Sequence, residues 1–395
     1  MSAPVYDVTT WPGAPVSPYT DIGAVINSII ADIKANQTTQ TTRPGGVIYI
    51  PPGHYNLLTR VVVDVSFLQI KGSGHGFLSE AIRDQSNTNS SQWVETLPGS
   101  SHIQVKNTDG NAEAFLVQRS GSPATVGRLN SVEFRDFCID GVASSRPFLP
   151  GNGKIGISVQ SDNDSFRMEG MGMVYLAHGL INKGADAPNI TNNFIAECGS
   201  CIELTGSSQV AKVTNNFLIS AWAGMSVYAQ NAEGLLLNGN SILWAPNVTL
   251  DGATRCSISG NKFVSYFPGL VTLQNGSSEN LMTGNHFRRE LGDGVSNGKD
   301  DLFGLIHLNG NGNAVTGNQF SVSLPTSAVT PSGAKLTIIL VGGGDSNYLA
   351  TNQIVSNVPS AIVLDASSTN TKILYSGQSG QLQPYSSSYA FVPTP

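Results

Sequence analysis

Charged residues are scarce in this chain. Only 12% of its 395 residues are Asp, Glu, Lys or Arg, about half of the usual quarter. Because 40% of the residues are hydrophobic, the chain can bury a large core, and disorder driven by charge is excluded. The 21 Lys and Arg are scattered and the net charge is −6, so binding to nucleic acid is not expected. A surface made mainly of Asn, Ser, Thr and Gly is typical of an extracellular β-protein and suits a neutral substrate.

Long apolar segments are also missing. No run approaches the roughly 18 consecutive apolar residues of a membrane span, so no membrane association is expected. The opening MSAPVYDVTTWPG has no apolar region that could act as a secretion signal. The protein is therefore either cytoplasmic or secreted with a signal that is absent from this sequence.

Cysteine and histidine show no metal-binding pattern. Four cysteines are too few and too dispersed for a disulfide scaffold, and the CxxC spacing of Cys198 and Cys201 has no second Cys or His pair beside it. The histidines form no HxH or HxxxH pair. We therefore expect buried thiols, no metal and no cofactor.

A short repeat dominates the chain from about residue 190. An Asn is followed two residues later by Phe or Ile, and the repeated Asn residues are Asn192, Asn215, Asn240, Asn261, Asn285, Asn318 and Asn352. The steps between them are 23, 25, 21, 24, 33 and 34 residues, so the last two are one period plus a loop. Seven occurrences of a spaced pattern indicate a repeat architecture.

Each period contains three short β-rich runs separated by Gly, Asn or Ser. One period contains the runs 235–237, 241–243 and 248–250. Such runs with no helical stretch between them predict one triangular coil of a parallel β-helix, which rises about 4.8 Å per coil of about 24 residues. The recurring Asn is then expected to stack into a ladder of side-chain amides.

The N-terminal part fits the same architecture with a cap. Residues 20–36 place apolar side chains on one face at helical spacing, with Thr20 or Asp21 as N-cap, and we expect this helix to cover the open end of the coils. Coils with inserted loops are predicted over 45–375 and a tail over 376–395. A single all-β domain, a parallel β-helix, replaces the two or three domains that the length alone suggests.

Two carboxylates are not explained by the repeat. Glu197 lies five residues after the repeated Asn, where the other periods have Ser, Ala, Tyr, Glu, Ser and Asn. Asp186 lies eleven residues before Glu197. Two carboxylates within one coil can converge on one face or corner, as glycosidic-bond chemistry requires. The alternative is that Asp186 caps a turn and Glu197 is solvated.

Other polar motifs are less specific. Asp162 and Asp164 could bind calcium but are more typical of a solvated turn. Residues 72–76 (GSGHG) resemble a phosphate loop only superficially, because no helix and no Lys-Ser/Thr follow. Further candidates for substrate binding are Trp93, Glu203, Trp222, Arg288, Asp300 and Asp301. Isolated Trp residues more often pack than stack on sugars.

The sequence resembles the inulin fructotransferases, which release difructose anhydride from inulin. The similar segments include 184–186 (GAD), 196–206 (AECGSCIELTG), 21–26 (DIGAVI), 74–77 (GHGF), 134–138 (FRDFC) and 161–166 (SDNDSF). The resemblance extends over nearly the whole chain. It implies a right-handed parallel β-helix assembled as a homotrimer, with each active site in a cleft between neighbouring subunits.

The resemblance also implies a reaction. The two catalytic carboxylates of the family fall on Asp186 and Glu197, and members are usually secreted. Inulin is a neutral fructose chain, which agrees with the scarcity of charge. Our hypothesis is that Glu197 protonates the departing glycosidic oxygen while Asp186 stabilises or traps the reacting carbon, until a hydroxyl of the terminal fructose attacks in place of water.

Several alternatives stay open at this point. Difructose anhydride III is favoured over anhydride I because it is the commoner family activity, and a related group hydrolyses anhydride III with the same carboxylates. The loops 288–301 and 321–335 are expected to carry that difference. A glycan-binding β-helix without activity, as in tail fibres and adhesins, is also possible, whereas a calcium-dependent pectate lyase lacks its acidic cluster and basic residues.

Overall fold

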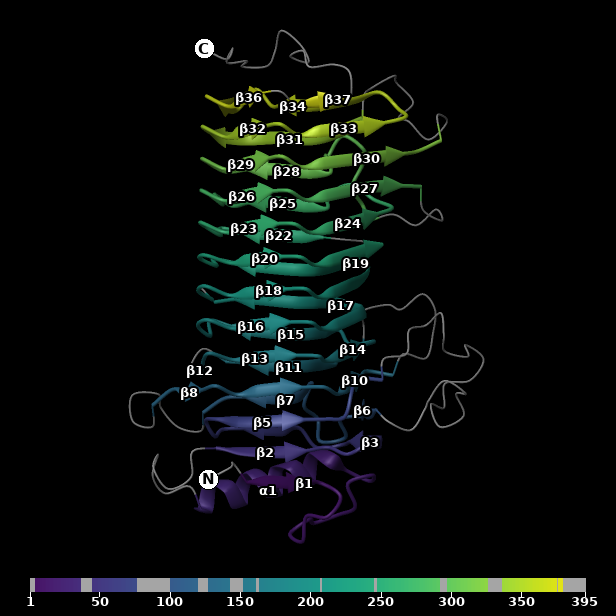
Figure 1. The fold of residues 1–395 in the computed structure, drawn as a ribbon, viewed down its shortest axis with the longest axis vertical. Helices are drawn as coiled ribbons and strands as arrows, with labels where there is room; N and C mark the ends of the chain where they lie inside the picture. Colours follow the sequence, from purple (N-terminus) through teal and green to yellow (C-terminus); the bar gives the residue numbers. More distant parts are fainter. Residues whose placement is uncertain are drawn as a thin grey trace. The chain divides into compact units, whose positions relative to one another are not determined.

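The structure is a computed structural model of the chain. It describes residues 4–36, 45–76, 100–119, 127–142, 152–160, 163–206, 208–244, 247–291, 297–325, 336–374 and 376–378. The chain forms two compact units, Met1–Glu203 and Leu204–Pro395. Both consist of short parallel strands stacked as successive rungs (Figure 1).

In the first unit the strands form three faces. The first face contains β1 (Val5–Asp7), β2 (Gly46–Tyr49), β5 (Leu68–Lys71), β9 (Glu133–Arg135), β13 (Arg167–Glu169) and β16 (Asn189–Thr191). The second contains β3 (Gly53–Leu57), β6 (Ser101–Val105), β10 (Cys138–Asp140), β14 (Gly172–Val174) and the start of β17 (Phe194–Thr205). The third contains β4 (Val61–Val63), β7 (Glu113–Val117), β11 (Ile155–Val159) and β15 (His178–Lys183). Each coil visits the three faces in this order, which confirms the predicted parallel β-helix.

The predicted helix is present as α1 (Ile22–Asn36), and it contacts β2, β3 and β4 at one end of the first unit (Figure 1). Asp21 caps it, because Oδ1 accepts a hydrogen bond from Gly23 N at 3.1 Å. The same carboxylate accepts bonds from Leu58 N and from the backbone and hydroxyl of Thr59. Asp21 therefore joins the helix to the chain between β3 and β4.

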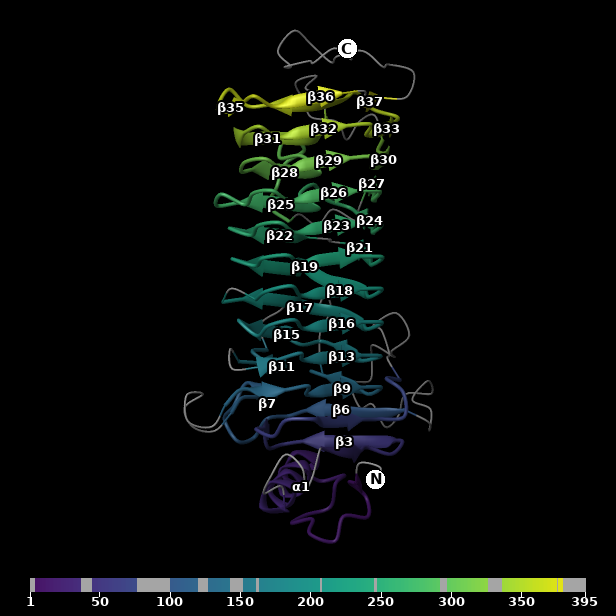
Figure 2. The same cartoon turned by 60° about the vertical axis from the view of Figure 1, so that its left-hand side comes forward.

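The second unit repeats the three faces, with its rungs visible from a second side in Figure 2. Its first face contains β18 (Lys212–Thr214), β20 (Leu236–Asn238), β23 (Ser257–Ser259), β26 (Leu281–Thr283), β29 (Ala314–Thr316), β32 (Tyr348–Ala350) and β36 (Lys372–Leu374). The second contains the start of β19 (Phe217–Gln230), β21 (Ser241–Trp244), β24 (Lys262–Ser265), β27 (His286–Glu290), β30 (Gln319–Ser323), β33 (Gln353–Ser356) and β37 (Gly377–Gln378). The third contains the end of β19, β22 (Val248–Asp251), β25 (Val271–Gln274), β28 (Ile306–Asn309), β31 (Leu336–Asp345) and β34 (Ser360–Leu364), and the short β35 (Ser368–Thr369) pairs with the end of β31. β37 continues the coils into the range predicted as tail; residues 379–395 lie outside the described part.

A ladder of buried asparagines runs between the first and second faces. In the second unit Asn240, Asn261, Asn285 and Asn318 each accept hydrogen bonds at Oδ1 from the backbone N–H and the Nδ2 of the Asn in the preceding coil, at 2.9–3.0 Å. Each Nδ2 also donates to a backbone carbonyl, for example Asn285 to Ile258. The predicted ladder is therefore confirmed, with every side-chain amide satisfied inside the stack.

The predicted alignment is wrong by one residue in its first two repeats. The ladder positions there are Asn193 and Asn216, which are 2% exposed, and Asn193 Oδ1 accepts a bond from Met171 N at 3.0 Å. Asn192 and Asn215 instead take the preceding turn position with φ of 58° and 57°, which Gly occupies in most later coils. Asn tolerates this left-handed conformation better than most residues, so a pair of Asn fills both positions.

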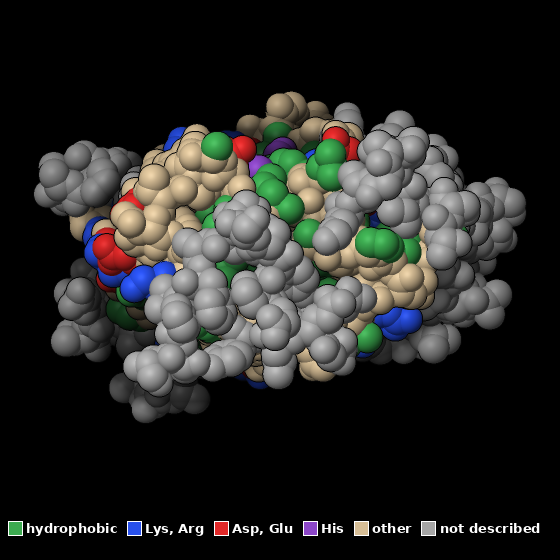
Figure 3. Space-filling model, turned by 90° about the horizontal axis from the view of Figure 1, so that it is seen from above, with side chains coloured by type: hydrophobic (Ala, Val, Ile, Leu, Met, Phe, Trp, Pro, Cys, Tyr) green, Lys and Arg blue, Asp and Glu red, His purple; other side chains and the backbone are tan. Residues whose placement is uncertain are grey.

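The core lies between the three faces and is filled by aliphatic and aromatic side chains. In the second unit Phe263, Phe287 and Phe320 stack with ring centroids 4.6 and 4.9 Å apart, one ring per coil. In the end-on view of Figure 3, charged side chains lie toward the rim and a group of hydrophobic side chains lies nearer the middle. Within the described residues, no helix has the length and apolar character needed to cross a membrane.

Candidate active site

Glu197 lies at the corner where its coil passes from the second face to the third. It directly follows Ala196, which pairs with Val174 of the preceding coil, and its φ is 53°. Tyr175, the next residue after Val174, has a φ of 55°, so this corner requires a left-handed residue in both coils. Gly or Asn would meet that requirement with less strain than Glu. Backbone geometry therefore does not explain why a half-buried carboxylate stands here.

Asp186 lies at the other end of the third face, where the chain turns from β15 toward β16. Its backbone forms an isolated parallel bridge with Asp164, and its Oδ2 lies 3.0 Å from Nη1 of Arg128. Arg128 also donates from Nη2 to the carbonyl of Asn163 at 2.8 Å. The two contacts hold the guanidinium against the carboxylate, so Asp186 is oriented by a cation while about 38% of its side chain stays exposed.

The two carboxylates do not meet within one chain. Glu197 occupies the same corner as Tyr175, one coil farther along, and this corner precedes the third face. Asp186 follows the end of β15, at the far end of that face. Six residues of β15 span about 17 Å at about 3.3 Å per residue. Paired carboxylates in glycosidases are only about 5–9.5 Å apart. In a single chain Asp186 and Glu197 therefore flank the third face from opposite corners.

A His–Glu pair lies on the outer side of the third face between these corners. His178 Nδ1 is 2.6 Å from Oε1 of Glu203. Burial works to raise the pKa of Glu203, but hydrogen bonds from His178 and Ser200 outweigh it and the pKa is lowered. The hydrogen bond to Glu203 in turn raises the pKa of His178 against the opposing effect of burial. Glu203, a predicted substrate-binding residue, is thus a half-buried carboxylate whose ionised form is stabilised by its hydrogen bond with His178.

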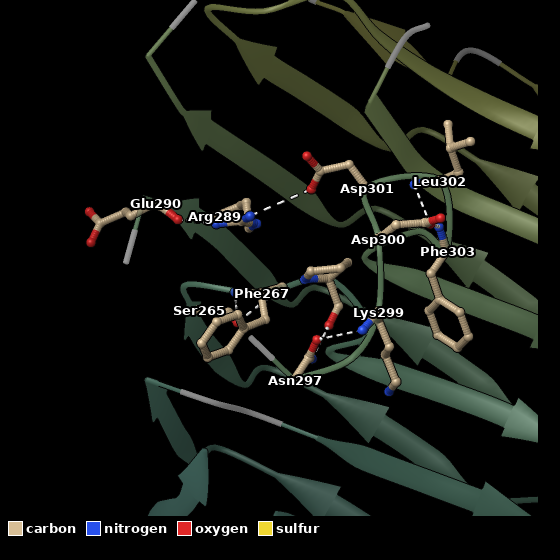
Figure 4. Close-up of polar contacts among 11 residues, drawn as sticks. Ser265, Phe267, Arg289, Glu290, Asn297, Lys299, Asp300, Asp301, Leu302 and Phe303 are labelled. Carbon is tan, nitrogen blue, oxygen red and sulfur yellow. Dashed lines mark hydrogen bonds and ion pairs between the residues drawn. The ribbon is translucent and has the colours of Figure 1, made fainter. Parts of the chain in front are cut away.

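Asp300 and Asp301 belong to the second unit and have structural partners there (Figure 4). Asp300 Oδ1 accepts hydrogen bonds from the backbone of Leu302 and Phe303 at 3.0 and 3.1 Å, which closes a turn. Asp301 Oδ1 lies 3.5 Å from Nη2 of Arg289, a side chain that is only 9% exposed. These contacts account for both residues as supports of the segment that precedes β28.

The remaining sequence candidates are distributed over the molecule. Arg288 belongs to β27 and forms an ion pair with Glu290 of the same strand. Trp93 lies outside the described residues. Trp222 belongs to β19, and its side chain lies outside the described part.

The metal and redox motifs are also placed by the structure. Asp162 is not described, and Asn163 of the same motif is buried and donates to the carbonyls of Val117 and Gln160. All four cysteines are buried and free, as predicted, and burial raises the pKa of Cys198 to about 12. Across the described ranges, no group of three or more His, Cys, Asp or Glu could hold a metal ion.

Two residues that sequence analysis missed contact the predicted ones. Arg128 reaches Asp186 only because the short strands β8 (Leu129–Asn130) and β12 (Asn163–Asp164) pair and the bridge to Asp186 continues that stack. His178 reaches Glu203 from the preceding coil. Neither belongs to the repeated pattern, so only the stacking of coils brings them together.

The three-faced stack of parallel coils makes this chain a parallel β-helix protein with carboxylates at two corners of one coil. A family model described as the β-helix repeat of inulin fructotransferase matches residues 284–395, and one described as periplasmic copper-binding protein (NosD) matches residues 151–334. The inulin fructotransferase (DFA-I-forming) of Arthrobacter globiformis is 71% identical over 395 residues and covers 100% of both chains. The chain belongs to the inulin fructotransferase family.

Solved structures agree with this assignment. The crystal structure of DFA-IIIase from Arthrobacter chlorophenolicus A6 without its lid, in complex with GF2, has a TM-score of 0.87 and 44% identity and covers 96% of both chains. The same enzyme in complex with DFA-III has a TM-score of 0.85 and 41% identity over 95% of both chains. The family resemblance inferred from sequence is thereby confirmed.

Proposed function

We propose that this protein is a secreted inulin fructotransferase that releases difructose anhydride I from the end of inulin. The observation that carries the proposal is the 71% identity over the full length to an enzyme named as DFA-I-forming. Sequence analysis favoured anhydride III on the frequency of that activity in the family, and that preference stays untested. The 40–44% identity to DFA-IIIase structures is much lower, so an inulin fructotransferase is better supported than an enzyme of that kind.

We propose further that each active site combines residues of two subunits of a homotrimer. Asp186 and Glu197 lie at opposite ends of the third face, and they are eleven residues apart in a coil of about 24, which corresponds to about 2.2 Å along the stack. In a cyclic trimer with parallel axes, one edge of each subunit faces the opposite edge of its neighbour. Such an arrangement brings Glu197 of one chain to the level of the partner subunit's Asp186.

The chemistry then follows from these groups. Glu197 donates a proton to the glycosidic oxygen as the bond between that oxygen and C2 breaks. The partner subunit's Asp186, oriented by the partner subunit's Arg128, stabilises the positive charge that develops at C2. A hydroxyl of the terminal fructose forms the new bond to C2 and returns its proton to Glu197. The product is a cyclic dianhydride, and the catalytic groups end in their starting protonation states.

Excluding water from the site is essential to this outcome. An intramolecular hydroxyl outcompetes water only when the terminal disaccharide is held folded against C2. A cleft closed by two subunits supplies such confinement. The partly exposed Arg128–Asp186 pair becomes a buried pair in that arrangement, which strengthens its electrostatic effect.

The test is to incubate the protein with inulin and to identify the products by NMR. Difructose anhydride I is the expected product. Anhydride III would refute the assigned product, and free fructose would show a hydrolase. The absence of any reaction, with retained binding to inulin, would favour the glycan-binding alternative.

A further inference from the structure

His75 lies on the second face of the first unit, far in sequence from the coil that it contacts. Its ring lies against Phe194, with ring centroids 6.2 Å apart and an interplanar angle of 29°. Phe194 begins β17, the strand that contains Glu197. The strand that contains the candidate acid therefore begins with one member of an aromatic pair, and the other member comes from an earlier coil.

The position of His75 is built into the stack. Gly172 pairs with Phe194 in the adjacent coil, and a Cβ added at Gly172 would lie 2.9 Å from Cβ of His75. The missing side chain at Gly172 thus leaves the space that the base of His75 fills. Since φ at Gly172 is not in the left-handed region, the need for space rather than for backbone freedom accounts for this glycine.

The segment that carries His75 is anchored on both sides. Gly72 N donates to the carbonyl of Arg135 at 2.9 Å, and Gly74 N donates to the carbonyl of Asp136 at 2.7 Å. Ser101 N donates to the carbonyl of Gly74 at 3.1 Å. Backbone contacts within its own coil and to the next coil therefore fix the backbone of the segment that carries His75, which is the rigidity that a recognition site requires.

The pair has the chemistry of a sugar platform. Burial lowers the pKa of His75, so the imidazole is neutral near pH 7, which suits an uncharged sugar. Phe194 is half-buried and adds a flat apolar surface. Three residues of extended strand place Glu197 about 10 Å farther along β17.

We infer that His75 and Phe194 bind a sugar residue of the inulin chain next to the linkage that Glu197 cleaves. The inference rests on the proposed function and deepens it by naming a second binding position on the same strand. The residue bound there is not the one that reacts. The platform therefore contributes equally to the ground state and the transition state, and it affects KM more than kcat.

The test compares kcat and KM for His75→Ala, Phe194→Ala and Gly172→Ala on inulin and on fructo-oligosaccharides of increasing length. We expect KM for the long substrates to rise by about tenfold or more with kcat within about threefold, because uniform binding energy is lost. Gly172→Ala should reproduce the effect of His75→Ala by displacing the ring. Phe194→Tyr keeps the aromatic ring and should therefore have a KM near the wild-type value, unlike Phe194→Ala. On the shortest substrate that reacts, the variants should differ little in KM.

The matched control is His286→Gln. His286 is a half-buried histidine at the start of β27, on the second face of the second unit, and its ring contacts Ser321. The substitution should leave both constants unchanged. A loss of kcat at constant KM, or an equal loss on all substrate lengths, would overturn the platform. If KM is unchanged in His75→Ala while Glu197→Gln is inactive, the platform is refuted and the proposed function stands. If Glu197→Gln is active, the proposed function is refuted. Calorimetric titration of a fructo-oligosaccharide into Glu197→Gln protein, with and without His75→Ala, measures the same contact without turnover.

Discussion

Two inactive variants should regain activity when their chains assemble together. Asp186→Asn and Glu197→Gln each remove one carboxylate, and in the proposed homotrimer of either variant every site is incomplete. A mixed trimer contains interfaces at which an intact Glu197 of one chain meets an intact Asp186 of the partner subunit. Every mixed trimer, whichever chain is in the majority, has one such interface among its three, so about a third of wild-type activity is expected of the purified mixed trimers.

The separation of the two carboxylates in the structure is the reason to expect recovery of activity. Within one chain, β15 separates the two carboxylates by about 17 Å, roughly twice the longest separation used by paired carboxylates. A site contained in one chain would leave each chain of the mixture with one lesion and would give no recovery. The distinction is therefore between about a third of wild-type activity and none.

The assay is release of dianhydride from inulin by coexpressed, separately tagged chains purified through both tags. Native mass spectrometry verifies the mixed trimers, and coexpression of Glu197→Gln with wild-type chain calibrates the dilution of sites. Verified mixed trimers without activity would refute the two-subunit site. Near-normal activity of either single variant would refute the catalytic assignment itself.

Three further predictions concern the supporting contacts. Arg128→Ala should lower kcat by about tenfold or more through loss of orientation, while the melting temperature changes little because a partly exposed ion pair contributes only about 0–1 kcal/mol. The His178–Glu203 pair should stabilise the fold most between pH 4.5 and 6.5. The raised pKa of His178 makes its contribution complete below 6.5 and lost as pH rises through the folded-state value, and the lowered pKa of Glu203 makes its contribution present above 4.5 and lost as pH falls. Glu203→Gln should therefore reduce the melting temperature most inside that window. Asn285→Ala should reduce the free energy of unfolding by about 2–5 kcal/mol, measured with denaturant, because several buried groups lose their hydrogen-bond partners.

Each of these predictions has its own control. Arg128→Lys keeps the charge and should retain intermediate turnover. A melting difference for Glu203→Gln that is independent of pH would contradict the charged pair. Asn192→Gly replaces an exposed Asn at a left-handed position and should leave stability nearly unchanged; a loss as large as that of Asn285→Ala would show that burial in the ladder is not the cause.

The repeat made most of the fold predictable because its signal is local. Asn240 and its equivalents mark one turn per coil, and the three short runs between them correspond to observed strands. The error at Asn192 and Asn193 has a local cause as well. Two adjacent Asn residues satisfy the same sequence pattern, and only the backbone conformation distinguishes the turn position from the ladder position.

The candidate site was predictable in composition but not in arrangement. Asp186 and Glu197 departed from the repeat, and this departure identified them. Their spacing of eleven residues did not reveal that the chain runs along two faces between them, so convergence within one coil was a reasonable but incorrect expectation. Arg128 could not be found because its contact depends on stacking between residues 58 positions apart.

The asparagine ladder also limits where the protein can change during evolution. The two long steps of the repeat, 33 and 34 residues, arise because extra residues lie between β27 and β28 and between β30 and β31. Both insertions occur at the corner between the second and third faces, and the ladder at the preceding corner keeps its hydrogen bonds across them. Glu197 stands at the same corner of its own coil. Loops of different length can therefore be inserted at the corner between the second and third faces, where the candidate acid also lies. Substrate range can thus diverge among relatives while the stack of coils stays intact.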